Sequence, residues 1–258
     1  MPVASGLYYF ANQADHLARP PVILIHGAGG NHLYWPPQVR RLPNQRIFAV
    51  DLPGHGKSEG LGYHTIDDYA DSIIEFLEAL KLSGAVLAGH SMGSAIALSA
   101  AIRFPKRVVG LVLVGGGAKL RVAPAILQSA SNLSAFANAV QMVTDFSFAP
   151  QTGERLKELA AQRMSETRPT VLHGDFVACD AFNAMDQLSE ISVPTLVLCG
   201  DKDQMTPPKY SEFLRDHIAG ARMEVVPNAG HMVMLEQPEK TAGILDDFLN
   251  TVSYQPGQ

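Results

Sequence analysis

The chain has 258 residues, of which 47% are hydrophobic and 17% charged; this is the composition of a globular protein with a sizeable core, not of a disordered one. Its formal net charge is −5 and its basic residues form no cluster, which argues against nucleic acid or an anionic membrane as a partner. Two cysteines are too few for a secreted disulfide scaffold, and neither lies in a metal-binding pattern.

No segment predicts export or membrane insertion. The first residues lack a basic region followed by an apolar stretch, so we expect no signal peptide. The longest uncharged stretch, Val122 to Thr144, is too rich in Ser, Asn and Gln to span a membrane. We therefore expect a cytoplasmic protein.

Short apolar segments alternate along the chain with longer amphipathic ones. The apolar segments, each typical of a parallel strand covered on both faces, are Val22–His26, Ile47–Asp51, Ala85–Gly89, Val108–Val114, Thr195–Cys199 and Met223–Val226. The clearest helix is Ile66–Leu80, which Thr65 can cap; further helices start at Thr206-Pro207 and at Pro238, the last running to about Thr251. This alternation predicts a doubly wound α/β fold with a mostly parallel sheet.

The alternation stops between residues 119 and 190. No strand pattern occurs there, and three helical stretches are expected near 123–143, 152–166 and 169–184. Because the first of them is almost free of charge, we predict that this insertion is a helical lid over an apolar pocket. Residues 1–118 and 191–258 then form the α/β core.

The segment Gly89–Gly93 has the pattern G-x-S-x-G. It directly follows an apolar strand and directly precedes a helix-forming run, Ser94–Arg103. A sharp strand-to-helix turn strains the serine backbone, and glycines on either side remove side chains that would collide. The pattern therefore predicts that Ser91 is a nucleophile exposed above the carboxyl edge of the sheet.

A serine hydroxyl needs a base, and the base needs a carboxylate. Of nine histidines, His231 lies in the loop after the last predicted strand, whereas His90, beside Ser91 in sequence, is expected to be structural. Asp201 and Asp203 both follow the strand Thr195–Cys199. Asp203 is the preferred acid because it lies further past the strand end, while Asp201 is expected to cap the turn. The order Ser, Asp, His is the one that this arrangement requires.

The segment His26–Gly30 follows the first predicted parallel strand and is rich in small residues. Such a loop lets backbone amides approach a substrate closely, so the amide of Ala28 is the expected oxyanion donor, with the amide of Met92 as the second.

Two nucleotide-binding patterns and a metal site are excluded. Gly56-Lys57-Ser58 ends like a phosphate-binding loop, but Asp51 stands where its first glycine belongs. Gly27-x-Gly29 begins like a dinucleotide fingerprint, but its third glycine position is His32. No metal-ligand spacing occurs, so we expect neither a metal nor another cofactor.

With these motifs in order, the chain resembles the α/β-hydrolase superfamily over nearly its full length. The matching segments are His26-Gly27, Asp51–Ser58, Gly89–Gly93, Gly200–Asp203 and Ala229–His231. The chain is most similar in character to small bacterial carboxylesterases and to meta-cleavage-product hydrolases. The serine at position 91 departs from the aspartate of epoxide hydrolases and haloalkane dehalogenases, which makes those activities improbable. Position 94 is serine where many relatives have another glycine. The resemblance implies an α/β-hydrolase fold but leaves the substrate open.

The expected activity is cleavage of small carboxylic esters through an acyl-enzyme on Ser91. Trp35, Phe136 and Met142 are candidate pocket residues, although core packing explains each of them equally well. Two alternatives stay open: a carbon–carbon hydrolase whose substrate carboxylate binds Arg121, Arg155, Arg163 or Arg168, and a slow-turnover ligand receptor on the same fold. The expected partner is a small ester, and the sequence does not decide between a monomer and a homodimer.

Overall fold

The protein is described by a computed structural model that covers residues 2–12 and 19–254. Its strands form one eight-stranded sheet in the order β1-β2-β4-β3-β5-β6-β7-β8. Their bounds are β1 Val3–Ala4, β2 Leu7–Asn12, β3 Val22–Ile25, β4 Ile47–Val50, β5 Ala85–His90, β6 Val108–Val114, β7 Thr195–Gly200 and β8 Arg222–Val226. From β4 to β8 every neighbouring pair is parallel, while β1 with β2 and β2 with β4 are antiparallel.

The predicted parallel strands are confirmed to within a residue or two at each end. β1 and β2 were not predicted: β1 has only two residues, and β2 is mostly half-buried rather than covered on both faces. The sheet carries its helices on both faces, so the expected doubly wound arrangement is correct.

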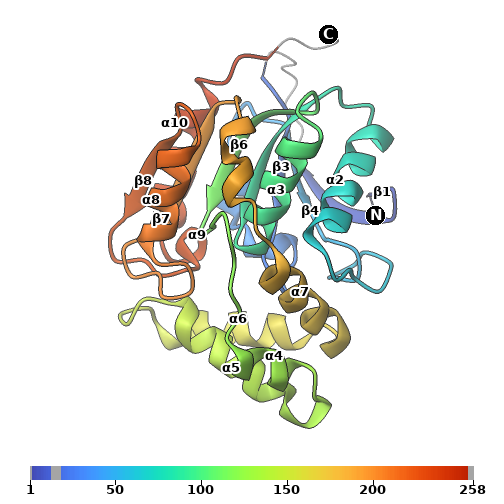
Figure 1. The fold of residues 1–258 in the computed structure, drawn as a ribbon, viewed down its shortest axis with the longest axis vertical. Helices are drawn as coiled ribbons and strands as arrows, with labels where there is room; N and C mark the ends of the chain where they lie inside the picture. Colours follow the sequence, from blue (N-terminus) through green and yellow to red (C-terminus); the bar gives the residue numbers. More distant parts are fainter. Residues whose placement is uncertain (1, 13–18, 255–258) are drawn as a thin grey trace.

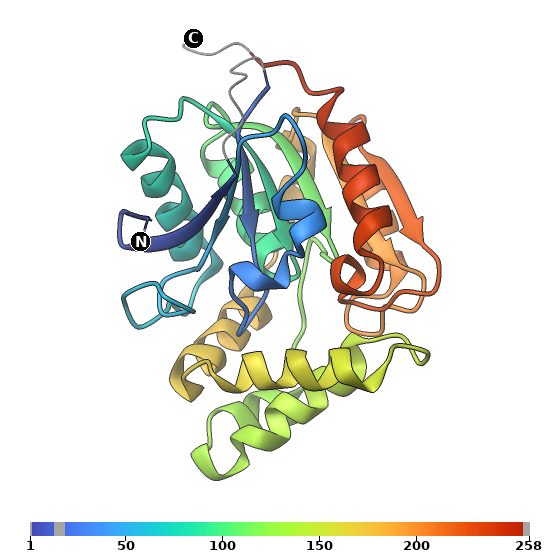
Figure 2. The same cartoon turned by 180° about the vertical axis from the view of Figure 1, so that it is seen from behind.

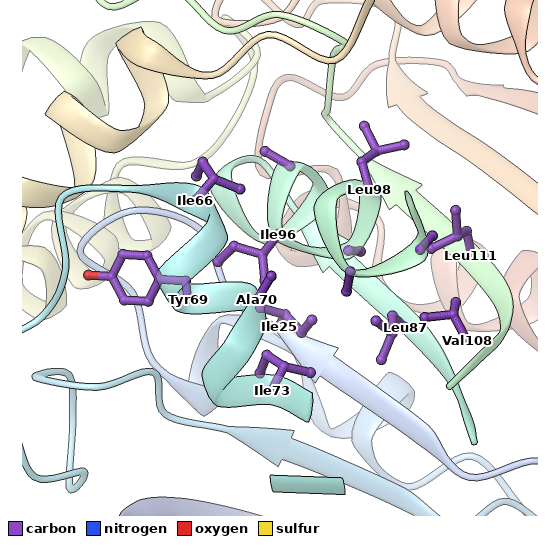
Figure 3. Packing of buried hydrophobic residues seen from close by; sticks show 14 of the residues in the cluster. Ile25, Ile66, Tyr69, Ala70, Ile73, Leu87, Ile96, Leu98, Val108 and Leu111 are labelled. Atoms are coloured by element: carbon purple, nitrogen blue, oxygen red, sulfur yellow. The ribbon is translucent and has the colours of Figure 1, made fainter. Parts of the chain in front are cut away.

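Alternate residues of each central strand supply two separate cores. Ile23 and Ile25 of β3 pack on one face of the sheet with α2 (Ile66–Ala79), α3 (Met92–Arg103) and α8 (Pro208–His217). Figure 1 shows these helices, and Figure 3 shows side chains of α2 and α3, such as Ile73 and Ile96, packed against the strands. Val22 and Leu24 belong to the opposite core. That core also includes α1 (Pro37–Arg40), α9 (Val233–Glu236) and α10 (Pro238–Leu249), and α10 lies in front in Figure 2. The two-residue period of a strand thus explains why these segments are apolar throughout.

Helix ends follow the predicted local signals. The amide of Asp68 donates to the hydroxyl of Thr65 at 3.1 Å, which is the expected cap of α2. The helix expected at Thr206-Pro207 begins one residue later, at Pro208, and α10 begins at Pro238 as expected. Within the described residues, no helix has the length and apolar character needed to cross a membrane.

Between β6 and β7 the chain forms only helices. They are α4 (Pro124–Ala130), α5 (Phe136–Ser147), α6 (Glu154–Ser165) and α7 (Pro169–Ala181), with 3-10 turns at Leu133–Ala135 and Met185–Glu190. A further 3-10 turn, His32–Tyr34, follows β3. Figures 1 and 2 both place α4–α7 together beyond one end of the sheet. An antiparallel bridge between Lys119 and Asn183 joins the two chain segments at the base of this helical insertion. Its role as a lid stays a prediction.

Candidate active site

Ser91 lies in the sharp turn between β5 and α3. Its backbone is strained, with φ 54° and ψ −116°, a conformation that residues other than glycine rarely adopt. The flanking glycines make the turn possible: a Cβ atom on Gly89 would lie 2.0 Å from the carbonyl oxygen of Gly93, and one on Gly93 would lie 2.4 Å from that of Ile25. Any larger residue at either position would therefore push the serine out of place.

The loops after β7 and β8 bring an acid and an imidazole together. Nδ1 of His231 lies 2.9 Å from Oδ2 of Asp203, and both side chains are buried. The other carboxylate oxygen accepts the amides of Met205 and Thr206 at 2.9 and 2.8 Å. Burial alone would raise the pKa of Asp203, but the charge and hydrogen bond of His231 outweigh it and hold that pKa below its ordinary value. Because an ionised carboxylate only accepts, Nδ1 carries the proton and Nε2 is free to take one.

The two loops are fixed against each other. A Cβ atom on Gly200 would lie 2.1 Å from the carbonyl oxygen of Ala229, and the amide of Lys202 donates to that same oxygen at 2.9 Å. Asp201 accepts the Ala229 amide at 3.4 Å and pairs with Lys202 at 3.1 Å, so it stabilises the turn and stands apart from His231. The structure thus pairs His231 with Asp203 and not with Asp201.

Ser91 and His231 both line an apolar cavity of about 320 Å³. Ser91 is half-buried, so its hydroxyl is accessible from this cavity. Within the described residues no hydrogen bond joins the Ser91 hydroxyl to His231, although both residues line the same cavity; catalytic hydrogen bonds often tighten only when substrate binds. The three predicted residues therefore lie at one site, two of them directly bonded.

The loop after β3 forms the adjoining wall. Ala28 lines the cavity, and Met92 is the first residue of α3. In the part of the chain that the structure describes, neither amide donates a hydrogen bond to another protein group. Two such amides beside Ser91, one of them at a helix N-terminus, can stabilise an anion.

Comparison with known proteins agrees with this geometry. A family profile described as "alpha/beta hydrolase fold" matches residues 20–238. The chain belongs to the alpha/beta hydrolase fold family. A curated relative, 3-oxoadipate enol-lactonase 1 of Acinetobacter baylyi, is 28% identical over 239 residues, which is 90% of each chain. A second, pimeloyl-[acyl-carrier protein] methyl ester esterase of Neisseria meningitidis, is 29% identical over 90% of this chain and 94% of its own.

Solved structures with the same fold are also similar to this chain over most of its length. A thermophilic esterase is 33% identical with a TM-score of 0.80, covering 95% of this chain and 98% of its own. The enol-lactonase of Burkholderia xenovorans is 25% identical with a TM-score of 0.86, covering 95% and 96% of the two chains. The protein is thus a hydrolase of the α/β family, with esterases and lactonases among its relatives.

In this α/β hydrolase, the sequence analysis missed one residue, which joins the helical insertion to the loop after β3. Asp175 of α7 is fully buried, and its carboxylate accepts the amide of Gly29 at 2.8 Å, Nε2 of His55 at 2.8 Å and the hydroxyl of Tyr69 at 2.6 Å. Burial alone would lower the pKa of His55, but the Asp175 charge prevails and raises it. Thr167 donates to the carbonyl oxygen of Gly29 at 2.9 Å. A signal existed in the sequence, because an aspartate stands within the buried stripe of α7.

None of the three candidate pocket residues is among those that line the two cavities beside Ser91. Trp35 is fully buried in the core that contains α1 and α10, and it lines neither cavity beside Ser91. Phe136 and Met142 pack within the helical insertion instead. The cavity of about 320 Å³ that Ser91 and His231 line is called the main cavity below; its apolar lining residues include Ile126, Phe146, Phe176 and Met205.

Arg121 is the single charged residue among those lining the main cavity. The other arginines considered as carboxylate ligands lie elsewhere: Arg155 pairs with Glu158 at 3.5 Å, Arg163 donates to the carbonyl of Leu33 at 3.4 Å, and Arg168 donates to that of Gly60. His90 is buried as expected, and His16 falls outside the described residues.

Proposed function

We propose that the protein hydrolyses small carboxylic esters through an acyl-enzyme on Ser91. The observation that carries this proposal is the buried hydrogen bond between His231 and Asp203, which leaves Nε2 of His231 as a base in the cavity that Ser91 lines. In the first step the Ser91 oxygen attacks the ester carbonyl while Nε2 accepts its proton. The amides of Ala28 and Met92 stabilise the oxyanion, and the protonated imidazole then gives its proton to the leaving alcohol.

Water completes the reaction by the same steps in reverse. His231 takes a proton from the water, whose oxygen bonds to the acyl carbon, and the proton returns to the Ser91 oxygen as the acyl bond breaks. Asp203 stays ionised throughout and stabilises the imidazolium that forms twice in each cycle.

The cavity supports a small, mostly apolar substrate. Its volume of about 320 Å³ lies at the lower end of ligand pockets, and Ile126, Phe146, Phe176 and Met205 provide apolar walls. Short-chain esters fit such a site better than long acyl chains, and the neighbouring enol-lactonases act on cyclic esters, which react by the same acyl transfer.

The test is an ester panel of graded acyl length combined with a serine-reactive phosphonate. We expect steady multiple turnover that peaks at short acyl chains, a loss of about 10⁴-fold or more in kcat for Ser91→Ala, and phosphonate labelling of Ser91. Ser165→Ala, at an exposed serine of α6, is the matched control and should behave as wild type. Full activity in Ser91→Ala would refute the proposal. A single turnover only would favour the ligand receptor instead.

The position of Arg121 favours one second candidate, carbon–carbon hydrolysis of a ring-fission diketone acid. Arg121 lines the same cavity as Ser91, and a guanidinium is a suitable ligand for the substrate carboxylate. Comparison of kcat/KM for a p-nitrophenyl ester and for a ring-fission product separates the two activities. A higher value for the ring-fission product, lost in Arg121→Gln, would make the second candidate the correct one.

A further inference from the structure

A second, smaller cavity adjoins Ser91 beneath the insertion. Its volume is about 40 Å³, which exceeds what one water molecule needs. Ser91, His231 and Ala28 line it together with Tyr34 and His90, and the remaining walls are mostly apolar, including Val143 and Met164. An apolar cavity of this size would stay dry unless polar groups face it.

Tyr34 contributes a donor without a partner. The residue is 2% exposed, and its hydroxyl oxygen is buried with no hydrogen bond in the described residues. Burial raises the pKa of this phenol, so it keeps its proton. A buried tyrosine hydroxyl ordinarily finds a partner.

His90 contributes an acceptor without a partner. Its Nε2 lies 3.0 Å from the carbonyl oxygen of His231, and because a carbonyl only accepts, Nε2 carries the ring proton. Burial and the neighbouring His231 lower the pKa of His90 to about 3, so the ring is neutral at pH 7 and Nδ1 presents a lone pair. Among the residues that the structure describes, the buried Nδ1 has no hydrogen-bond partner, and a Cβ atom on Gly27 would lie 3.0 Å from it. The glycine therefore keeps the space beside Nδ1 open.

We propose that the small cavity is a hydroxyl-binding subsite of the hydrolase, an inference that rests on the ester hydrolysis proposed above. The two orphaned groups, the Tyr34 hydroxyl and Nδ1 of His90, are complementary: one donates and the other accepts. A hydroxyl group satisfies both at once, by accepting from Tyr34 and donating to His90. A carbonyl oxygen or an ammonium group would satisfy one and leave the other unpaired. Two other hydroxyls line the cavity: that of Ser147 already donates to the carbonyl of Val143 at 2.6 Å, and that of Ser91 is the proposed nucleophile.

Two molecules can bring this hydroxyl. One is water, stored beside the acyl-enzyme; on deacylation it would lose a proton to His231, form the new bond to the acyl carbon and release the Ser91 oxygen, which recovers the proton. The other is a substrate whose acyl chain carries a hydroxyl group. The subsite chemistry is the same in both cases, but the kinetic consequences differ.

Tyr34→Phe separates the two sources. With p-nitrophenyl acetate, a water site predicts an unchanged burst of p-nitrophenol followed by steady turnover about 10-fold slower, because one hydrogen bond to the water is lost. For a substrate hydroxyl, kcat/KM should fall about 10-fold for methyl 3-hydroxypropionate and stay unchanged for methyl butyrate. Tyr9→Phe, at a tyrosine that packs against Phe48 and Phe76 outside both cavities, is the matched control.

A crystal structure of the unmodified protein gives a readout that does not depend on a variant. We expect an oxygen atom within hydrogen-bond distance of both the Tyr34 hydroxyl and Nδ1 of His90. An empty cavity, or Tyr34→Phe kinetics equal to those of Tyr9→Phe with both ester types, would overturn the subsite. A wild-type protein that shows no burst and no phosphonate labelling at Ser91 would instead refute the ester hydrolysis on which the subsite rests.

Discussion

Removal of the Asp175 carboxylate is expected to reduce catalysis more than it disturbs substrate binding. This carboxylate accepts from Gly29, His55 and Tyr69, and Gly29 directly follows the residue that we propose as oxyanion donor. Gly29 itself has φ +63°, and a Cβ atom on it would lie 2.7 Å from Cδ1 of Leu172. The loop is therefore held by α7 through a hydrogen bond and through close packing.

The magnitude follows from what Asp175→Leu leaves behind. His55 loses its buried carboxylate and the Gly29 amide loses its acceptor, and breaking a buried charged pair typically costs about 3–5 kcal/mol of unfolding free energy. Loss of one oxyanion donor typically costs about 10²–10³ in kcat, so a displaced Ala28 amide should lower kcat by up to that factor with little change in KM. Asp175→Asn keeps one acceptor oxygen for Gly29 and should recover most of the lost kcat.

The assay pairs urea unfolding with steady-state kinetics on a short ester and with the affinity of a boronic acid, whose tetrahedral adduct resembles the oxyanion. Tyr69→Phe is the control, because it removes one hydrogen bond to the same carboxylate and leaves the bond to Gly29. Equal kcat and equal boronate affinity in Asp175→Leu and Tyr69→Phe, despite lower stability of the first, would show that Asp175 has no role in positioning the loop.

Two further predictions concern stability and the serine turn. Burial lowers the pKa of His26 to about 4 and of His90 to about 3, so both are neutral in the folded protein. Since both titrate near 6.5 when unfolded, stability should fall as the pH drops from 6.5 towards 4, on the order of 3 kcal/mol for His26 alone. The raised pKa of His55 also stabilises the folded protein, but this contribution is already complete below pH 6.5. The contribution from the lowered pKa of Asp203 is lost only below about pH 3.8. Neither contribution changes between pH 6.5 and 4, so neither offsets the loss of stability caused by His26 and His90. Urea midpoints that stay constant between pH 7 and 4.5 would contradict this. In Gly93→Ala, the new Cβ atom would collide with the Ile25 carbonyl, so Ser91 should lose phosphonate reactivity by at least about 10²-fold, as stopped-flow labelling would measure.

The predictable parts of the fold are the segments whose residues all have the same surroundings, such as strands that are buried along their whole length. Strands such as β5 and β7 are buried on both faces, so nearly all of their residues are apolar and the pattern is visible without knowledge of the neighbouring strand. β2 is half-buried and pairs antiparallel to β4, and neither fact leaves a periodic signal in six residues. The sharp turn at Ser91 was equally visible in the sequence, because the close contacts of Gly89 and Gly93 with neighbouring backbone atoms leave room only for glycine at these two positions.

The pocket was not predictable in the same way. Its walls depend on how four helices of the insertion pack on the core, and that packing has no local sequence signature. Met142 and Val143 are neighbours on α5, yet only Val143 lines a cavity beside Ser91. Trp35 is large, apolar and close in sequence to the oxyanion loop, which favours a pocket residue, but the 3-10 turn before it places its side chain in the core while Tyr34 faces the site.

The contacts of Gly29 also restrict how the insertion can move. α7 supplies the acceptor Asp175, Thr167 just before it supplies a donor, and Met164 of α6 lies 3.1 Å from where a Cβ atom on Gly29 would be. If α6 and α7 swung away from the core, the Gly29 amide and carbonyl would lose their partners and Asp175 would enter solvent together with the loss of its bond to His55. An opening that kept the Gly29 contacts would therefore have to displace α4 and α5 relative to α6 and α7; Ile126 of α4 and Phe146 of α5 are the residues of these two helices that line the cavity with Ser91.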